Sequence, residues 1–241
     1  MRRPFLKLCL AFLFAAANGL AVGQEQRPFV LGIAPHTSAR VILEMYQPLR
    51  RQLEATLRQP VEVQTAPDFT EFARRALNQE YDIAVTTGHQ ARLLQLDAGY
   101  LPLVTYSADF KAVALVDKNG PIRNAADLQG RNVLGLSPSS LVTLWGLQWM
   151  KRQNLSDVSV RYVSAADSVS RQVLAGEAAA AFTSLANFQK LPADQQIRMR
   201  ILAQSEPMVG RVYVLNKRWG RERKGVDKAL SAFAASEEGK A

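Results

Sequence analysis

Residues 134–147 read LGLSPSSLVTLWGL and predict a strand, a tight turn and a helix in succession. The apolar run at residues 133–136 is typical of a buried strand, and the polar residues 137–140 predict a turn that ends in a helix N-cap. Apolar residues then recur at helical spacing, at Leu141, Leu144, Leu147 and Met150. This succession is the repeating unit of an α/β fold.

The turn itself is a candidate anion site. A helix start leaves backbone N–H groups without partners and carries partial positive charge, and Ser137, Ser139 and Ser140 add hydroxyl donors. Such a turn can hold a phosphate-like or carboxylate anion without a Lys or Arg. The alternative is that Ser139 or Ser140 only caps the helix, as serine does at many helix starts that bind nothing.

The same alternation of strand and helix patterns extends along the chain in both directions. Strands are predicted at residues 29–34, 61–66, 81–85, 101–106, 111–116, 133–136, 158–163, 178–182, 201–203 and 212–215. One long helix is predicted over residues 41–57, kinked at Pro48 because proline cannot donate to the helical ladder. We therefore expect an α/β fold with mostly parallel sheets flanked by helices.

The elements divide into two lobes. Residues 24–107 together with 210–241 are expected to form lobe one, and residues 108–209 lobe two, because the last strand and helix have no partners in the second half. The chain then crosses between the lobes twice, which predicts a two-crossover hinge. Ligands of open α/β sheets bind beyond the carboxyl ends of the strands, so the predicted site is the cleft between the lobes.

Polar residues that follow the predicted strands are the candidate ligand contacts. Thr86 and Thr87 end the third strand just before a helix start, and Thr183 ends a strand of the second half. The alternative for the first two is a capping role. His89 follows in the same turn and is able to donate to an anion; the alternative is a surface position without a ligand. We interpret His36, which follows the first strand, as a surface histidine.

Several classes of function lack a signal in this sequence. With only two histidines and no third ligand at useful spacing, no metal site is predicted, and no cofactor motif is present. Basic residues are dispersed rather than clustered with aromatics, so we expect no nucleic-acid partner. The sequence also has no Gly-x-Ser-x-Gly elbow, phosphate loop or paired carboxylates, which favours a binding protein over an enzyme.

Residues 1–23 have the anatomy of a cleavable secretory signal. Arg2, Arg3 and Lys7 precede an apolar core too short for a stable membrane anchor, and AVG at residues 21–23 is a small-x-small cleavage site. Cleavage would remove three positive charges and reduce the net charge from +9 to +6. The only cysteine, Cys9, lies in this segment without a lipoprotein cleavage box. We predict a periplasmic protein that is not a lipoprotein; the alternative is a retained N-terminal anchor.

Several segments resemble the phosphate/phosphite/phosphonate-type substrate-binding proteins of ABC transporters. In the first half these are VLGIAP at 30–35, YQPL at 46–49, APDF at 66–69 and YDIA at 81–84; in the second half they are IRNAADLQG at 122–130, SPSS at 137–140 and VLAGE at 173–177. The resemblance implies a two-lobed type II periplasmic-binding-protein fold. It also implies that an oxyanion binds at the Ser-rich turn, and that the partner is an inner-membrane ABC permease. We expect a monomer.

The resemblance implies individual site residues as well. Phe69 stands where phosphonate binders tend to carry a ligand-contacting Tyr, and would form a wall of the pocket. Ala166 and Ala179 stand where those proteins usually carry a His and an Asp. We therefore expect a small oxyanion or a carboxylated solute rather than an aminoalkylphosphonate. A sensory protein that partners a membrane kinase, or a periplasmic enzyme on the same fold, is the alternative. The last helix is expected to be shortened.

Overall fold

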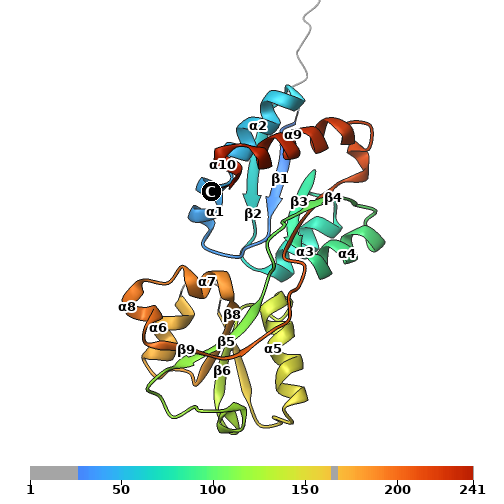
Figure 1. Ribbon diagram of the computed structural model, residues 1–241. Coiled ribbons are helices and arrows are strands. Elements are labelled where there is room, and N and C mark those ends of the chain that lie inside the picture. Colours follow the sequence, from blue (N-terminus) through green and yellow to red (C-terminus); the bar gives the residue numbers. More distant parts are fainter. Residues whose placement is uncertain (1–26, 164–167, 241) are drawn as a thin grey trace, which may run out of the picture.

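The computed structural model describes residues 27–163 and 168–240 and has two lobes joined by two crossing segments (Figure 1). Each lobe is built on a five-stranded sheet, and each sheet has one strand that runs antiparallel to both of its neighbours. The prediction of a two-lobed α/β fold with mostly parallel sheets is confirmed. Two sequence-based observations lie outside the described residues. They are the predicted signal at residues 1–23 and Ala166, which stands where phosphonate binders usually carry a His.

The first lobe contains the chain's beginning and its end. Its strands are β1 (Phe29–Ile33), β2 (Val61–Thr65), β3 (Ile83–Thr87), β4 (Leu101–Thr105) and β10 (Arg211–Leu215), in the sheet order β2-β1-β3-β10-β4. Its helices are α1 (Ala39–Met45), α2 (Gln47–Leu57), α3 (Phe69–Leu77), α4 (Gly88–Asp97), α9 (Arg223–Ala235) and α10 (Glu237–Lys240), with a 3-10 turn at Lys217–Trp219. The last strand and the last long helix, β10 and α9, belong to this lobe.

Alternation along β1 explains why helices cover both faces of this sheet. Phe29, Leu31 and Ile33 pack with the apolar faces of α1, α2 and α9, whereas Val30 packs with α3 and α4 on the other side. All of these side chains are buried. Because successive side chains of a strand point to opposite faces, a continuous apolar run is what a sheet covered on both sides requires.

The second lobe repeats this arrangement. Its strands are β5 (Ala112–Asp117), β6 (Asn132–Gly135), β7 (Ser159–Tyr162), β8 (Ala180–Ser184) and β9 (Met199–Gln204), in the order β7-β6-β8-β5-β9. Its helices are α5 (Leu141–Arg152), α6 (Val169–Leu174), α7 (Leu185–Gln189) and α8 (Ala193–Gln196), with a 3-10 turn at Ala125–Leu128. Trp145 and Trp149 of α5 stack on each other and pack edge-on against Phe182 of β8. They are core residues.

The prediction of one kinked helix over residues 41–57 is wrong. The structure has two helices, and Tyr46 both ends α1 and precedes α2. Pro48 lies in the first turn of α2, where a helix has no internal acceptor for a backbone N–H, so proline is tolerated there without disturbing a ladder. Pro48 thus marks a helix start and not a bend.

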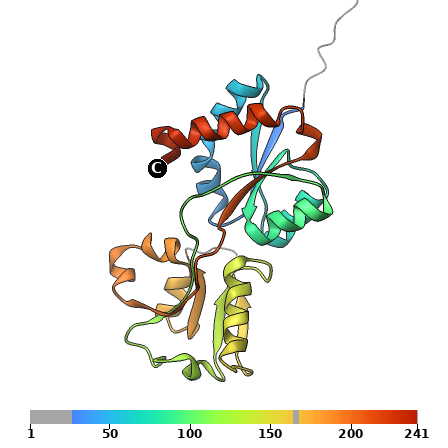
Figure 2. The same ribbon diagram turned by 45° about the vertical axis from the view of Figure 1, so that its right-hand side comes forward.

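The two crossing segments lie side by side between the lobes (Figures 1 and 2). Phe110 of the first segment and Met208 of the second form an isolated antiparallel bridge, with N–H···O distances of 3.2 and 2.8 Å. Ser205 adds a hydroxyl that accepts from the backbone N–H of Ala112 at 2.9 Å. The hinge is therefore a short paired ribbon rather than two loose connections.

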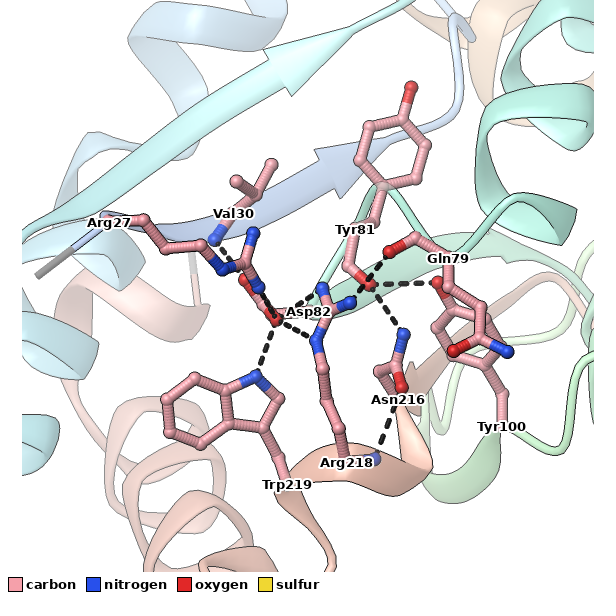
Figure 3. A network of polar contacts seen from close by, with 9 residues as sticks. All are labelled: Arg27, Val30, Gln79, Tyr81, Asp82, Tyr100, Asn216, Arg218 and Trp219. Carbon is pink, nitrogen blue, oxygen red and sulfur yellow. Dashed lines mark hydrogen bonds and ion pairs between the residues drawn. The ribbon is translucent and has the colours of Figure 1, made fainter.

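A buried carboxylate fixes the return of the chain to lobe one (Figure 3). Asp82 is fully buried at the amino end of β3, and it accepts hydrogen bonds from the backbone N–H of Val30 and from side chains of Arg27, Arg218 and Trp219. The Arg27 and Arg218 bonds measure 2.7 Å each. This network joins β1, β3 and the turn after β10, at the end of the sheet away from the second lobe (Figures 1 and 3).

Candidate functional site

A cavity of about 280 Å³ lies between the two lobes, at the edges of both sheets where the parallel strands end. Lobe one and the crossing segments contribute His36, Phe69, Thr86, Thr87, Tyr106, Asp109, Phe110 and Arg211, among others; lobe two contributes Leu136, Ser140, Leu141, Ser184, Asn187 and Lys190. This is the position that the α/β topology predicts for a ligand. We call it the interlobe cavity.

The structure brings half of the predicted contact residues to this cavity. Phe69, Thr86, Thr87 and Ser140 line it, whereas Ser137, Ser139, His89 and Thr183 do not. His89 instead borders a separate cavity of about 510 Å³ beside α4, whose walls are mostly apolar. The ligand contacts themselves remain predictions.

Ser140 is engaged at the start of α5. Its hydroxyl donates to the Thr143 Oγ1 at 2.8 Å and accepts from the Thr143 backbone N–H at 3.3 Å. The Thr143 hydroxyl in turn accepts from the backbone N–H of Leu136 at 2.9 Å. These bonds join the end of β6 to the helix start, so Ser140 has the capping role that was the alternative for the Ser-rich turn, while one side of it still faces the cavity.

Ser139 and His89 contact each other across the lobes. The His89 Nε2 lies 3.0 Å from the carbonyl oxygen of Ser139 and therefore donates to it, and the Ser139 Oγ lies 3.2 Å from the Thr70 Oγ1 of lobe one. The Ser137 Oγ lies 3.3 Å from the Ser139 Oγ. Burial lowers the pKa of His89. In this arrangement these residues hold the two lobes together.

The predicted threonines have internal partners. The Thr86 hydroxyl donates to the Gln90 side chain, and the Thr87 Oγ1 lies 3.2 Å from the His89 Nδ1. The hydroxyl of the buried Thr183 accepts from the Asn187 side chain at 3.3 Å. Thr183 thus supports Asn187, which does line the cavity.

Arg211 is a site residue that the sequence analysis missed. Its Nη1 donates to the Tyr106 hydroxyl at 3.3 Å, and its guanidinium carbon lies 5.4 Å from the centre of the Tyr106 ring. Among the described residues, no carboxylate oxygen lies within 4.0 Å of the Arg211 guanidinium nitrogens. A partly buried cation without a carboxylate partner is favourable to an anion that joins it.

Tyrosines rather than acids surround this cation. The Tyr106 and Tyr213 hydroxyls lie 3.3 Å apart, and the Tyr46 hydroxyl is buried with no hydrogen-bond partner in the described part of the chain. Burial raises the pKa of both Tyr46 and Tyr213, so these phenols stay neutral at physiological pH. Burial also acts to raise the pKa of Tyr106, but the charge of Arg211 and the hydrogen bonds of the Tyr106 hydroxyl outweigh it and lower that pKa. Within the described residues, Arg211 is thus surrounded by phenols and has no carboxylate partner in its own lobe.

His36 was also missed, since it was interpreted as a surface histidine. Its Nδ1 lies 2.9 Å from the carbonyl oxygen of Ala34, and its Nε2 is buried without a hydrogen-bond partner within residues 27–163 and 168–240. Burial, followed by the positive charges of Arg211 and Lys190, lowers the pKa of His36 to about 3. The imidazole is consequently neutral over the physiological range.

The charges that line the interlobe cavity favour an anion. Arg211 faces it from lobe one and Lys190, at the end of α7, from lobe two, while Asp109 is the one carboxylate along the described walls. No group of three or more His, Cys, Asp or Glu residues in the described part of the chain is placed to hold a metal ion. The walls thus offer hydrogen-bond donors and an unneutralised guanidinium.

Topology explains why Arg211 was missed. Candidates from the strand pattern were residues that follow parallel strands, whereas β10 is antiparallel and its first residue, Arg211, pairs with Thr87 at the carboxyl end of β3. The available signal was a lone arginine at the start of the last strand, directly after the second crossing.

No helix among the residues described is long and apolar enough to cross a membrane.

The chain matches a family model described as "ABC transporter, phosphonate, periplasmic substrate-binding protein" over residues 31–241. Among solved structures it is similar to PhnD1 from Prochlorococcus marinus in complex with methylphosphonate (TM-score 0.76, 14% identity, 88% of this chain and 87% of that chain). It is also similar to a binding protein component of an ABC phosphonate transporter from Pseudomonas aeruginosa (0.74, 16%, 88% and 77%). A third is a protein from Xanthomonas citri bound to chloride ion (0.72, 19%, 88% and 85%). No curated protein matches the chain.

Proposed function

Since the chain belongs to the periplasmic substrate-binding proteins of phosphonate ABC transporters, we propose that it captures a small anion in the interlobe cavity and delivers it to an inner-membrane ABC permease. The observation that carries this proposal is Arg211, a cation in the cavity without a carboxylate within 4.0 Å among the described residues. An anion that enters completes this site electrostatically. Export by cleavage of residues 1–23, and action as a monomer, are part of the same proposal.

The proposed ligand is a phosphate- or phosphonate-like oxyanion, with a small carboxylate as the second class. Arg211 and the backbone N–H groups at the start of α5 would hold the charged group, and Phe69 would form one wall. An ammonium group would find only Asp109 as a carboxylate along the described walls, and Asp109 is exposed. This supports the expectation that aminoalkylphosphonates are not the ligand.

The proposed mechanism is closure of the two lobes about the hinge. Arg211 belongs to lobe one, whereas Ser140 and Lys190 belong to lobe two, so a ligand that contacts all three is held only when the lobes are together. A ligand shifts this equilibrium by no more than the difference between its affinities for the closed and open arrangements. The permease would then recognise the closed form.

A thermal-shift screen of the mature chain tests this proposal. The panel contains phosphate, phosphite, methylphosphonate, 2-aminoethylphosphonate, sulfate, acetate and lactate. A ligand at one hundred times its Kd is expected to add about 2.7 kcal/mol to the free energy of unfolding. A panel in which no anion stabilises the protein would contradict the proposal. Ligand recovered chemically altered after incubation would contradict a purely binding role.

A further inference from the structure

His36 places a buried nitrogen beside the interlobe cavity. The Nε2 of His36 is buried without a partner among the described residues, in a side chain that lines the cavity together with Arg211. We propose, on the basis of the anion-binding function above, that the ligand is a singly protonated oxyanion, with its O–H donating to the His36 Nε2 and its charged oxygens facing Arg211. Hydrogen phosphonates and hydrogen phosphate are the class that fits.

The protonation state of His36 follows from its other ring nitrogen. The Nδ1 lies 2.9 Å from the Ala34 carbonyl oxygen, which only accepts, so the Nδ1 carries the hydrogen. In a neutral imidazole the Nε2 is then an acceptor with a free lone pair. A ligand that offers only acceptors leaves this lone pair unpaired, whereas an O–H group satisfies it.

The surroundings keep that lone pair from being protonated in the empty site. Two cations act on His36, Arg211 from β10 and Lys190 from the end of α7, and both disfavour a second proton on the ring. The other titratable groups around this part of the cavity are Asp109 of the first crossing and the phenols of Tyr46, Tyr106 and Tyr213. The neutral tautomer is thus the resting state, and the missing partner is a donor.

Proton balance gives this inference a measurable consequence. A monoanion R–PO₂(OH)⁻ brings its own proton, whereas a dianion R–PO₃²⁻ binds only if one proton is taken up from solvent. The complex therefore contains one proton between a ligand oxygen and the Nε2 in either case. Sulfonates and sulfate have the same shape and charge sign but carry no proton near neutral pH, so they leave a buried acceptor unpaired.

The test is isothermal titration calorimetry of the mature protein with methylphosphonate and its isostere methanesulfonate, from pH 5.5 to 8.5. We expect methanesulfonate to bind roughly ten- to a hundredfold more weakly. Above the second pKa of methylphosphonate, its Kd should rise about tenfold per pH unit. Titrations in two buffers of different ionisation enthalpy should show an uptake of one proton in that range.

His36→Gln provides the matched variant, because an amide side chain is able to turn either its oxygen or its nitrogen toward the ligand. We expect it to bind both anions with similar affinity and to lose the rise of Kd with pH. His36→Asn serves if the first variant fails to fold, and the wild-type comparison of the two anions decides the question without either variant.

The outcomes separate this inference from the proposed function. Methanesulfonate bound as tightly as methylphosphonate, or a Kd that does not change with pH, overturns the protonated-ligand inference and leaves anion capture intact. Binding confined to carboxylates would likewise overturn the protonated-ligand inference and leave anion capture intact. Failure of every anion in the panel to bind overturns the proposed function and the inference together.

Discussion

The imidazole of His36 shows how burial and neighbouring charge set the chemistry of a single residue. Burial and the charges of Arg211 and Lys190 lower its pKa to about 3, far below the usual value of 6.5. The buried Nε2 of His36 is unfavourable in the ligand-free protein, because among the described residues it has no hydrogen-bond partner to replace the water that it lost on folding. Such sites are typical of ligand-binding regions rather than of a core.

The lowered pKa of His36 predicts that stability depends on pH. Below pH 6.5 the unfolded chain binds a proton on His36, whereas the folded protein does not until about pH 3. The free energy of unfolding should therefore fall as the pH decreases through this window, by at most about 1.4 kcal/mol per pH unit from this residue. Urea unfolding of the ligand-free protein at pH 7, 6, 5 and 4 measures the slope, and His36→Gln should reduce it. Equal slopes in both proteins would show that His36 is not buried in this way.

The helix α5 begins at a capping residue, Ser140, that also lines the interlobe cavity. The Ser140 hydroxyl both donates to the Thr143 side chain and accepts from the Thr143 backbone N–H at the helix start. Ser140→Ala should therefore lower the free energy of unfolding by about 1 kcal/mol. Ser139→Ala, one position earlier, removes only two long hydroxyl contacts, of 3.2 and 3.3 Å, and should change it little. Chemical denaturation of both variants without ligand makes the comparison. A stability loss in Ser139→Ala alone would reverse the assignment of the cap.

The network around Asp82 joins two strands to the turn that precedes α9. Asp82→Asn removes the negative charge that Arg27 and Arg218 share and replaces one of the two acceptor oxygens with an NH2 donor. It should lower the free energy of unfolding by roughly 3 kcal/mol, at the low end for a buried pair because Arg27 is exposed and Arg218 half-exposed. Ligand affinity should not change, since the network lies at the opposite end of the sheet.

Asp97→Asn, at the exposed end of α4, is the matched control for that substitution and should leave stability nearly unchanged. Denaturation monitored by tryptophan fluorescence checks both variants. Equal effects of the two substitutions would mean that Asp82 contributes no more than a surface charge.

Patterns local in sequence predicted most elements, and contacts distant in sequence supplied what was missing. The apolar run at β1 and the helical spacing after Ser140 are decided by neighbours, so period and capping chemistry were sufficient. The position of Pro48 was noticed, but whether it bends one helix or starts another depends on packing. Arg211 and His36 meet only through the antiparallel pairing of β10 with β3, which no local pattern encodes.

The whole molecule repeats one design twice. In each sheet a single antiparallel strand enters from the hinge, so that Arg211 of β10 lies opposite Thr87 and Ala112 of β5 lies opposite Ser184. Both crossing segments therefore reach the ligand edge of their sheet first (Figures 1 and 2). Because both lobes line the interlobe cavity, the proposed mechanism couples closure to binding, and contacts such as His89 with Ser139 would have to break on opening.

The central claim is that Arg211 holds an anion between the lobes, and the Kd of the best anion from the screen for Arg211→Gln measures this most directly. Arg198→Gln is the control, since it removes the same charge from an exposed position just before β9, at the edge of the second sheet away from the cavity. We predict that Arg211→Gln weakens binding at least about thirtyfold without lowering the stability of the ligand-free protein, while Arg198→Gln binds as the wild type does. Unchanged affinity in Arg211→Gln, or an equal loss in both variants, would contradict the account.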